Sequence, residues 1–187
     1  MPGAAQTRIY DLASEQNGYF TAVQARLAGI TKQAIHNLTT RGSLERVSHG
    51  LYRLVHFPDG PMDPYVEATL WPLSIRGVIS HETALALYGL SDANPARIHL
   101  TVPRTWRLRR EVPKRLALHH IDLHEDDVNI YEGVPVTTPE RTIRDCDAAR
   151  LGAALVRQAI VDGRRTGHLR VRQAQKLERE LLGGTGP

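Results

Sequence analysis

The chain has 187 residues, of which 41% are hydrophobic and 24% charged, a composition that excludes a disordered or fibrous protein. Its apolar runs fall far short of the roughly 20 residues that a membrane helix needs, and its N-terminus lacks a charged segment followed by an apolar one. The single cysteine excludes an internal disulfide and a cysteine-based zinc cage. We therefore expect a soluble, cytoplasmic protein with room for two small domains.

The net charge of +4 favours an anionic partner, and the distribution of charge along the chain is more informative than the total. Residues 1–55 hold six Lys and Arg against three Asp and Glu, residues 56–142 hold nine against twelve, and residues 143–187 hold nine against five. The two ends are basic and the middle is acidic. A DNA-binding head with a separate body gives this pattern, and so does an ordinary solvated surface.

The first segment of the chain, residues 7–54, has the pattern of three helices followed by a hairpin. Apolar residues at helical spacing around Ile9 predict the first helix. Thr21 is a suitable N-cap for a second helix over residues 22–28, and Gly29 is a suitable left-handed stop.

A third helix follows at once, because Thr31 can cap residues 32–41 and Gly42 can end them. Only two residues separate it from the preceding helix, and this spacing predicts a helix-turn-helix. Ile35 and its apolar neighbours recur at helical spacing on one side of the third helix, so the opposite side is polar. The polar side carries Lys32, Gln33, His36, Asn37 and Thr40.

After the third helix, residues 44–47 and 51–54 alternate with the period of a strand around a turn that contains Gly50. This hairpin predicts a wing, and we interpret residues 1–56 as a winged helix-turn-helix whose third helix enters the major groove of DNA. The alternative is a winged helix that contacts only proteins. The candidate DNA-binding residues are Thr21, Thr31, Lys32, Gln33, His36, Asn37, Thr40, Arg46, His49 and Arg53.

A linker is expected over residues 57–63, where Pro58-Asp59-Gly60-Pro61 cannot continue a helix or a strand. Residues 64–187 then form a second domain that mixes helices with a small sheet and ends in a helical tail, so the fold class is α+β. Its predicted strands are 98–102, 116–121 and 134–137, and its predicted helices are 64–74, 81–88 capped by Ser80, one that begins at Pro139, and the tail over 153–182.

A basic segment with one aromatic residue, Trp106, lies between two predicted strands of the second domain. Such a segment can hold a nucleic-acid backbone, can dock an acidic protein, or can simply be solvated. Its basic residues are Arg104, Arg107, Arg109, Arg110, Lys114 and Arg115.

Metal-ligating residue types gather between His119 and Asp127, but neighbouring His119 and His120 point to opposite faces of a strand and no known ligand spacing links two of these residues. Cys146 shares a helix face with Ile143, which favours a place in the core over a nucleophile. The sequence also lacks a glycine-rich phosphate loop and the carboxylate–lysine motif of nucleases. We expect no metal, no cofactor and no catalytic residue, and hence no enzyme.

Four stretches of the sequence together resemble the AbiEi-type antitoxins: residues 18–21, 46–54, 79–90 and 135–143. The resemblance implies the antitoxin of a bacterial type IV toxin–antitoxin pair, often associated with phage defence. Such proteins repress their own operon by binding inverted repeats through the N-terminal domain, and their second domain counteracts a nucleotidyltransferase-like toxin. No catalytic residue comes with the resemblance.

The resemblance assigns DNA contacts to Lys32, Gln33, His36, Arg46 and Arg53. Within the later stretches, His81, Glu82, Thr138 and Arg141 each have a structural interpretation, with Thr138 as a helix cap and Arg141 paired with Asp145 four residues on. Two alternatives stay open at this point. One is a nuclease delivered to its substrate by a winged helix, and the other is a ligand-sensing transcription regulator without a toxin partner.

Overall fold

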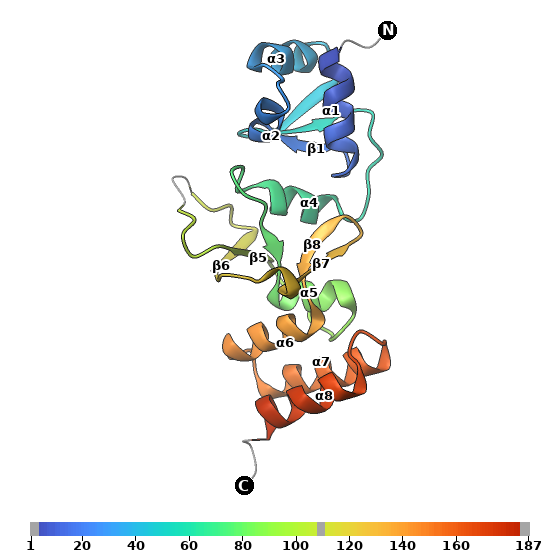
Figure 1. Ribbon diagram of the computed structural model, residues 1–187, viewed down its shortest axis with the longest axis vertical. Helices are drawn as coiled ribbons and strands as arrows, with labels where there is room; N and C mark the ends of the chain where they lie inside the picture. Colours follow the sequence, from blue (N-terminus) through green and yellow to red (C-terminus); the bar gives the residue numbers. More distant parts are fainter. Residues whose placement is uncertain (1–3, 108–110, 184–187) are drawn as a thin grey trace. The chain divides into compact units, whose positions relative to one another are not determined.

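The computed structural model describes residues 4–107 and 111–183 and has an α+β fold (Figure 1). The chain forms two compact units: Met1–Gly77 together with Ile130–Val134, and Val78–Asn129 together with Pro135–Pro187. The expected linker at 57–63 thus lies inside the first unit, which continues to Gly77. Within the described ranges, no helix has the length and apolar character needed to cross a membrane.

The first unit contains a three-stranded antiparallel sheet with the order β1-β3-β2. The hairpin β2–β3 was expected, whereas β1 was not, and it adds an edge strand by pairing Phe20 with Tyr52. The elements of this unit are α1 (Ala4–Ser14), β1 (Tyr19–Thr21), α2 (Ala22–Leu27), α3 (Lys32–Thr40), β2 (Leu44–Ser48), β3 (Leu51–Leu54) and α4 (Asp63–Leu70).

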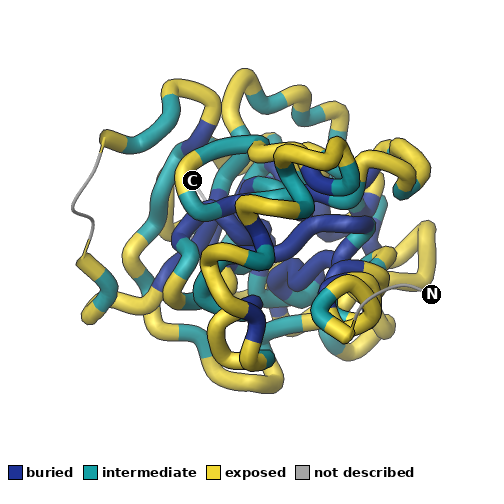
Figure 2. Tube along the Cα trace, turned by 90° about the horizontal axis from the view of Figure 1, so that it is seen from above, coloured by how far each residue is buried: buried dark blue, intermediate teal, exposed yellow. Residues whose placement is uncertain are grey.

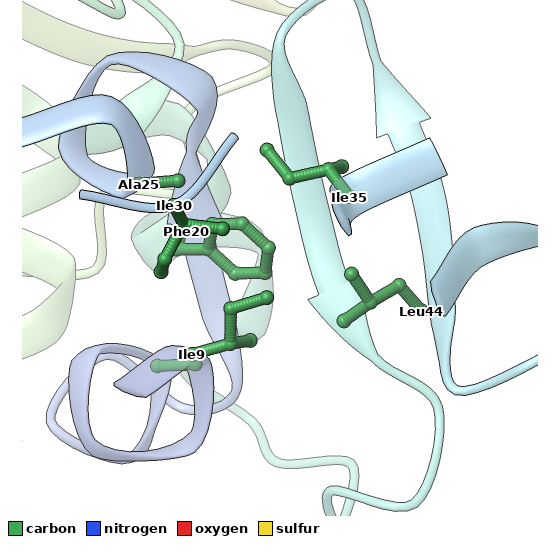
Figure 3. Close-up of a cluster of buried hydrophobic side chains, with 7 residues drawn as sticks. Ile9, Phe20, Ala25, Ile30, Ile35 and Leu44 are labelled. Atoms are coloured by element: carbon green, nitrogen blue, oxygen red, sulfur yellow. The ribbon is translucent and has the colours of Figure 1, made fainter. Parts of the chain in front are cut away.

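One apolar cluster holds α1, α2 and α3 against the sheet of the first unit (Figure 3). Phe20 lies at its centre, fully buried, with its ring stacked on Tyr52 at a centroid distance of 5.7 Å. Ile30, in the turn between α2 and α3, is buried in the same cluster and anchors that turn. Because Ile35 of α3 is also buried there, the opposite face of α3 must point to solvent. The buried members are Ile9, Ala13, Phe20, Ala25, Ile30, Ile35 and Leu44.

The second unit is built on a five-stranded mixed sheet with the order β6-β5-β4-β8-β7. Strands β5 and β6 are parallel, β4 and β8 are parallel, and β4 and β5 are antiparallel. The elements of this part of the chain are β4 (Val78–Ile79), α5 (His81–Tyr88), β5 (Ile98–Val102), β6 (Leu116–His120), the 3-10 turn Glu125–Asp127, β7 (Val128–Tyr131), β8 (Val134–Thr137), α6 (Pro139–Ala148), α7 (Ala153–Arg165), α8 (Val171–Leu177) and the π-helical turn Glu178–Leu182.

Most of the predicted elements of the second unit are confirmed, and their ends follow from local chemistry. Helix α5 ends at Gly89, whose φ of 63° is the left-handed conformation that glycine adopts without strain. Helix α6 has Pro139 in its first turn. Ser80 precedes α5 but makes no side-chain cap, which corrects its expected role. Buried and exposed stretches alternate along the trace (Figure 2), as expected when each element turns one face to a core.

Candidate nucleic-acid interface

Two capped helix starts fix the geometry of the helix pair α2–α3. At the start of α2, Thr21 Oγ1 accepts a hydrogen bond from the Gln24 backbone N–H at 3.1 Å, and the Gln24 side chain accepts one from the Thr21 N–H at 2.8 Å. At the start of α3, Thr31 Oγ1 accepts from the Ala34 N–H at 3.1 Å. Satisfied first-turn N–H groups stabilise each helix end, so both predicted N-caps are confirmed.

Helix α3 exposes the polar face that the sequence predicts. Ile35 is buried and Leu38 is half-buried, while all five polar candidates are exposed. Gln33 Nε2 donates to Asn37 Oδ1 at 2.8 Å, one helical turn away. This contact uses one amide proton of Gln33 and the oxygen of Asn37, and it orients the Gln33 carbonyl oxygen and the Asn37 amino group for further partners. The exposed candidates are Lys32, Gln33, His36, Asn37 and Thr40.

A groove runs along the turn between α2 and α3 and places a further basic residue beside the exposed face of α3. Arg26, in the last turn of α2, is exposed and lines this groove together with Lys32. Arg26 was not among the residues predicted from the sequence, although a cation in the helix before the turn is a usable signal. The groove is lined by Ala22, Val23, Arg26, Gly29, Ile30, Thr31, Lys32 and Ile35.

The end of the β2–β3 hairpin carries two exposed candidates that contact each other. The Arg46 guanidinium lies 3.2 Å from His49 Nδ1, and its Nε donates to the Ser48 carbonyl at 3.4 Å. The pairing register of the hairpin shifts between Arg46 and Ser48, as in a β-bulge, which bends the strand at this point. Arg46 and His49 are therefore accessible at the tip of the hairpin.

The structure contradicts the expectation that Arg53 contacts DNA. The Arg53 side chain is only 9% exposed, and its guanidinium pairs with Asp59 at 2.7 Å and with Asp63 at 3.3 Å. It also donates to two backbone carbonyls in residues 57–58, each at 3.1 Å. Arg53 occupies the same face of β3 as buried Leu51. It therefore fastens the segment after β3 to the sheet and has no free face for a phosphate.

Thr21 is also removed from the interface, because its side chain is consumed by the cap of α2 and the residue is 1% exposed. Thr31 has the same capping role but is exposed at the start of α3. Of the ten candidates, Thr21 and Arg53 are inaccessible to a duplex, and the other eight lie on the surface of α3, its first turn and the hairpin tip.

The second basic segment connects the parallel strands β5 and β6. Arg104, Arg107, Lys114 and Arg115 are exposed in this connection, whereas Arg109 and Arg110 lie outside the described residues. The Arg104 backbone N–H donates to Asp122 Oδ1 at 2.9 Å, which fastens the start of the connection to the segment after β6. Among the described residues of this connection, 103–107 and 111–115, no contact favours one of the three interpretations over the others.

The structural roles expected for Thr138 and Arg141 are confirmed. Thr138 Oγ1 accepts from the Arg141 N–H at 3.3 Å and caps α6. The Arg141 guanidinium pairs with Asp145 at 2.8 Å and with Asp127 at 2.5 Å. Burial raises the pKa of the Asp145 carboxyl, and the Arg141 hydrogen bond and charge counteract that rise. Arg141 thus ties α6 to the segment before β7.

Two further residues of the second unit, Cys146 and His81, are buried. Cys146 is buried, as expected, and burial raises the pKa of its thiol to about 12, so it is a core residue rather than a nucleophile. His81 is also buried, and its ring stacks on that of His119 at a centroid distance of 3.5 Å. The contact between these two histidines was not predicted from the sequence.

Comparison with known families agrees with this geometry in both parts of the chain. Residues 8–55, which contain the helix pair and the hairpin, match a family model described as a transcriptional regulator, AbiEi antitoxin. Residues 77–161 match the AbiEi antitoxin C-terminal domain. The chain belongs to the AbiEi antitoxin family. This AbiEi family member contains both characteristic regions in the order that the sequence resemblance predicts. A search of proteins with curated functions found no match.

A solved structure supports the fold of this AbiEi family member. The RV2827C protein from Mycobacterium tuberculosis is similar to it with a TM-score of 0.52, and the match covers 97% of this chain and 73% of that chain. The two sequences are 15% identical, so the likeness concerns the fold alone.

Proposed function

We propose that this AbiEi family member is an antitoxin that represses its own operon by binding DNA, with the first unit acting as a winged helix-turn-helix. The exposed polar face of α3 carries the proposal: five hydrogen-bonding side chains lie on the one side of the helix that the core leaves open. A helix of this kind fits the major groove, where its side chains can reach base edges. Family membership supports the regulatory role.

The position of each accessible candidate residue determines the DNA contact that we assign to it. Lys32 and Gln33, in the first turn of α3, are assigned to base edges, because Lys can donate to guanine and Gln can pair with adenine through both its donor and its acceptor. Thr31 and Arg26 border the groove at the start of α3 and suit phosphates. His36, Asn37 and Thr40 extend the reading face by two further turns, and Arg46 and His49 place the wing against the backbone or the minor groove.

Fluorescence anisotropy with the full chain and a duplex from its own upstream region tests this proposal. We expect Gln33→Ala to weaken specific binding by about 1–3 kcal/mol while leaving binding to a scrambled duplex unchanged. Gln175→Ala replaces an exposed glutamine on α8 and serves as the matched control. Affinity should fall steeply between about 50 and 200 mM salt as counterions are released. Equal binding of the upstream duplex by Gln33→Ala and wild-type protein would contradict the assignment.

We further propose that the second unit counteracts a nucleotidyltransferase-like toxin, as the family membership suggests. The test is co-expression of the chain with a toxin of this class encoded beside it, with growth as the readout. Rescue by the full chain, and also by a variant that has lost DNA binding, would support a role separate from repression. Retained repression without rescue would indicate a regulator that has no toxin partner.

A further inference from the structure

Three histidines of the second unit meet although they are far apart in the sequence. His81 begins α5, His99 lies in β5 and His119 lies in β6. The parallel pairing sets Thr101 opposite His119, and residues two apart on a strand share a face, so His99 and His119 lie on the same face of the sheet. The Ser80 N–H donates to the His99 carbonyl at 3.1 Å, which brings the first residue of α5 beside β5.

One pair of ring nitrogens in this histidine cluster has the spacing of a metal site, and a nitrogen of the third ring lies nearby. One nitrogen of each ring lies within 4.8 Å of the other two. His119 Nε2 is 3.2 Å from His99 Nδ1, and two nitrogen ligands of a tetrahedral zinc ion are about 3.3 Å apart when each metal–nitrogen bond is about 2.0 Å. We propose that His81, His99 and His119 together bind one transition-metal ion of the zinc class.

Neighbouring side chains contact the second ring nitrogen of two of these histidines, and one ion is bound in the ring planes only when the stacked rings of His81 and His119 tilt apart. Glu82 Oε2 lies 3.4 Å from His99 Nε2, which leaves His99 Nδ1 directed at His119. Ser80 Oγ, which accepts a hydrogen bond from Thr101 Oγ1, lies 2.9 Å from His81 Nδ1, and in the tautomer that carries the proton on Nδ1 the Nε2 atom is the ligand atom. A metal-bound histidine almost always gives its other ring N–H to a carboxylate or another oxygen. Glu82 and Ser80 supply these partners.

The electrostatics of the cluster also suit a soft or borderline cation. Burial lowers the pKa of His81 to about 3 and that of His119 to about 4, and it lowers the pKa of His99 as well. A metal binds the neutral form of imidazole, and burial favours that form in all three residues. Imidazole ligands select zinc, cobalt, nickel or copper over magnesium and calcium. The charges of Arg97 and Arg141 oppose a cation, so we expect weaker affinity than at a cysteine-rich structural zinc site.

Without a metal, the same three rings would be held by stacking and by an N–H···N hydrogen bond between His99 and His119. The metal-bound and metal-free forms of the cluster would differ in stability. A metal ion would join α5 to β5 and β6 through its own bonds, and because it binds only the folded state it would raise the stability of the second unit by mass action. The site is independent of the proposed DNA interface, so its test requires no DNA.

Calorimetric titration of Zn²⁺ into the full chain, freed of any affinity tag and dialysed against a chelator that is then removed, tests the site. We expect about one equivalent to bind and the melting temperature to rise. His119→Gln should weaken binding at least tenfold and abolish the thermal shift. His120→Gln, on the exposed opposite face of β6, should bind like wild type. Equal zinc binding by the two variants would overturn the proposal.

Co²⁺ absorption provides a test on the wild-type protein, so this test does not depend on whether a variant folds. Co²⁺ held by the histidine cluster in the wild-type protein should give the intense absorption of a tetrahedral site, and added Zn²⁺ should abolish it. Co²⁺ that gives only the weak absorption of the hydrated octahedral ion would refute the cluster as a metal site, even if His119→Gln proves unfolded by circular dichroism.

Discussion

Replacing Arg53 tests whether this residue stabilises the fold, as its contacts indicate, or contacts DNA, as the sequence predicted. Its guanidinium is almost wholly buried and bonds to Asp63 and to two backbone carbonyls. Breaking a buried ion pair by removing one partner costs about 3–5 kcal/mol. Since Asp59, the second carboxylate, is 89% exposed and adds little, we expect Arg53→Ala to lower the free energy of unfolding by about 3 kcal/mol. That is a large share of the stability of a small domain.

Urea denaturation followed by circular dichroism gives the change in stability, and anisotropy at a temperature where the variant is fully folded gives its DNA affinity. Arg46→Ala is the matched control, because Arg46 is exposed at the hairpin tip. We expect the control to change stability by no more than about 0.5 kcal/mol and to weaken binding to all duplexes alike. An Arg53→Ala protein of unchanged stability that nevertheless loses DNA affinity would refute the reasoning.

Two further predictions concern single positions in the cores. Gly18 has a φ of 85°, and a Cβ there would lie 2.6 Å from the Cβ of Phe57, so Gly18→Ala should cost about 3 kcal/mol of unfolding free energy. Gly42→Ala, at a φ of 74° with nothing within 4 Å, should cost only about 1 kcal/mol, and equal urea midpoints for the two variants would contradict this account. Because the thiol of Cys146 is buried with a pKa of about 12, we expect it to react with a thiol reagent at pH 8 only as fast as the protein unfolds; reaction at the rate of a free thiol would show that it is accessible.

The exposed polar face of α3 could be predicted from the sequence because everything that defines it is local. The cap Thr31, the buried Ile35 and the stop at Gly42 all lie within about three helical turns, and helical periodicity places the remaining side chains. The three-residue strand β1 could not be predicted in this way, since a segment that short has no period of its own and exists only through its pairing with β3.

Features that depend on residues distant in the sequence could not be predicted. Strand alternation places Arg53 on one face of β3. Only the structure shows that Asp63, ten residues further along the chain, lies against that face and that the arginine is buried. The histidine cluster was not predicted from the sequence for the same reason. His119 and His120 do point to opposite faces, as predicted, yet the partners of His119 lie in β5 and α5, and no spacing in the sequence reveals the register of a parallel strand pair.

The first unit is assembled from two separate stretches of chain, because Ile130–Val134 completes the body formed by Met1–Gly77. Arg76 donates to the Gly133 carbonyl at 2.8 Å across this join. During synthesis, domains generally fold as their residues leave the ribosome, N-terminal parts first. The apolar core of this unit lies within residues 9–54, and only the short segment Ile130–Val134 is translated after β5 and β6. A nascent regulator would therefore add Ile130–Val134 to its first unit only once about half of the second unit has been made, so chains that terminate before Ile130 should lack the contact of Arg76 with Gly133.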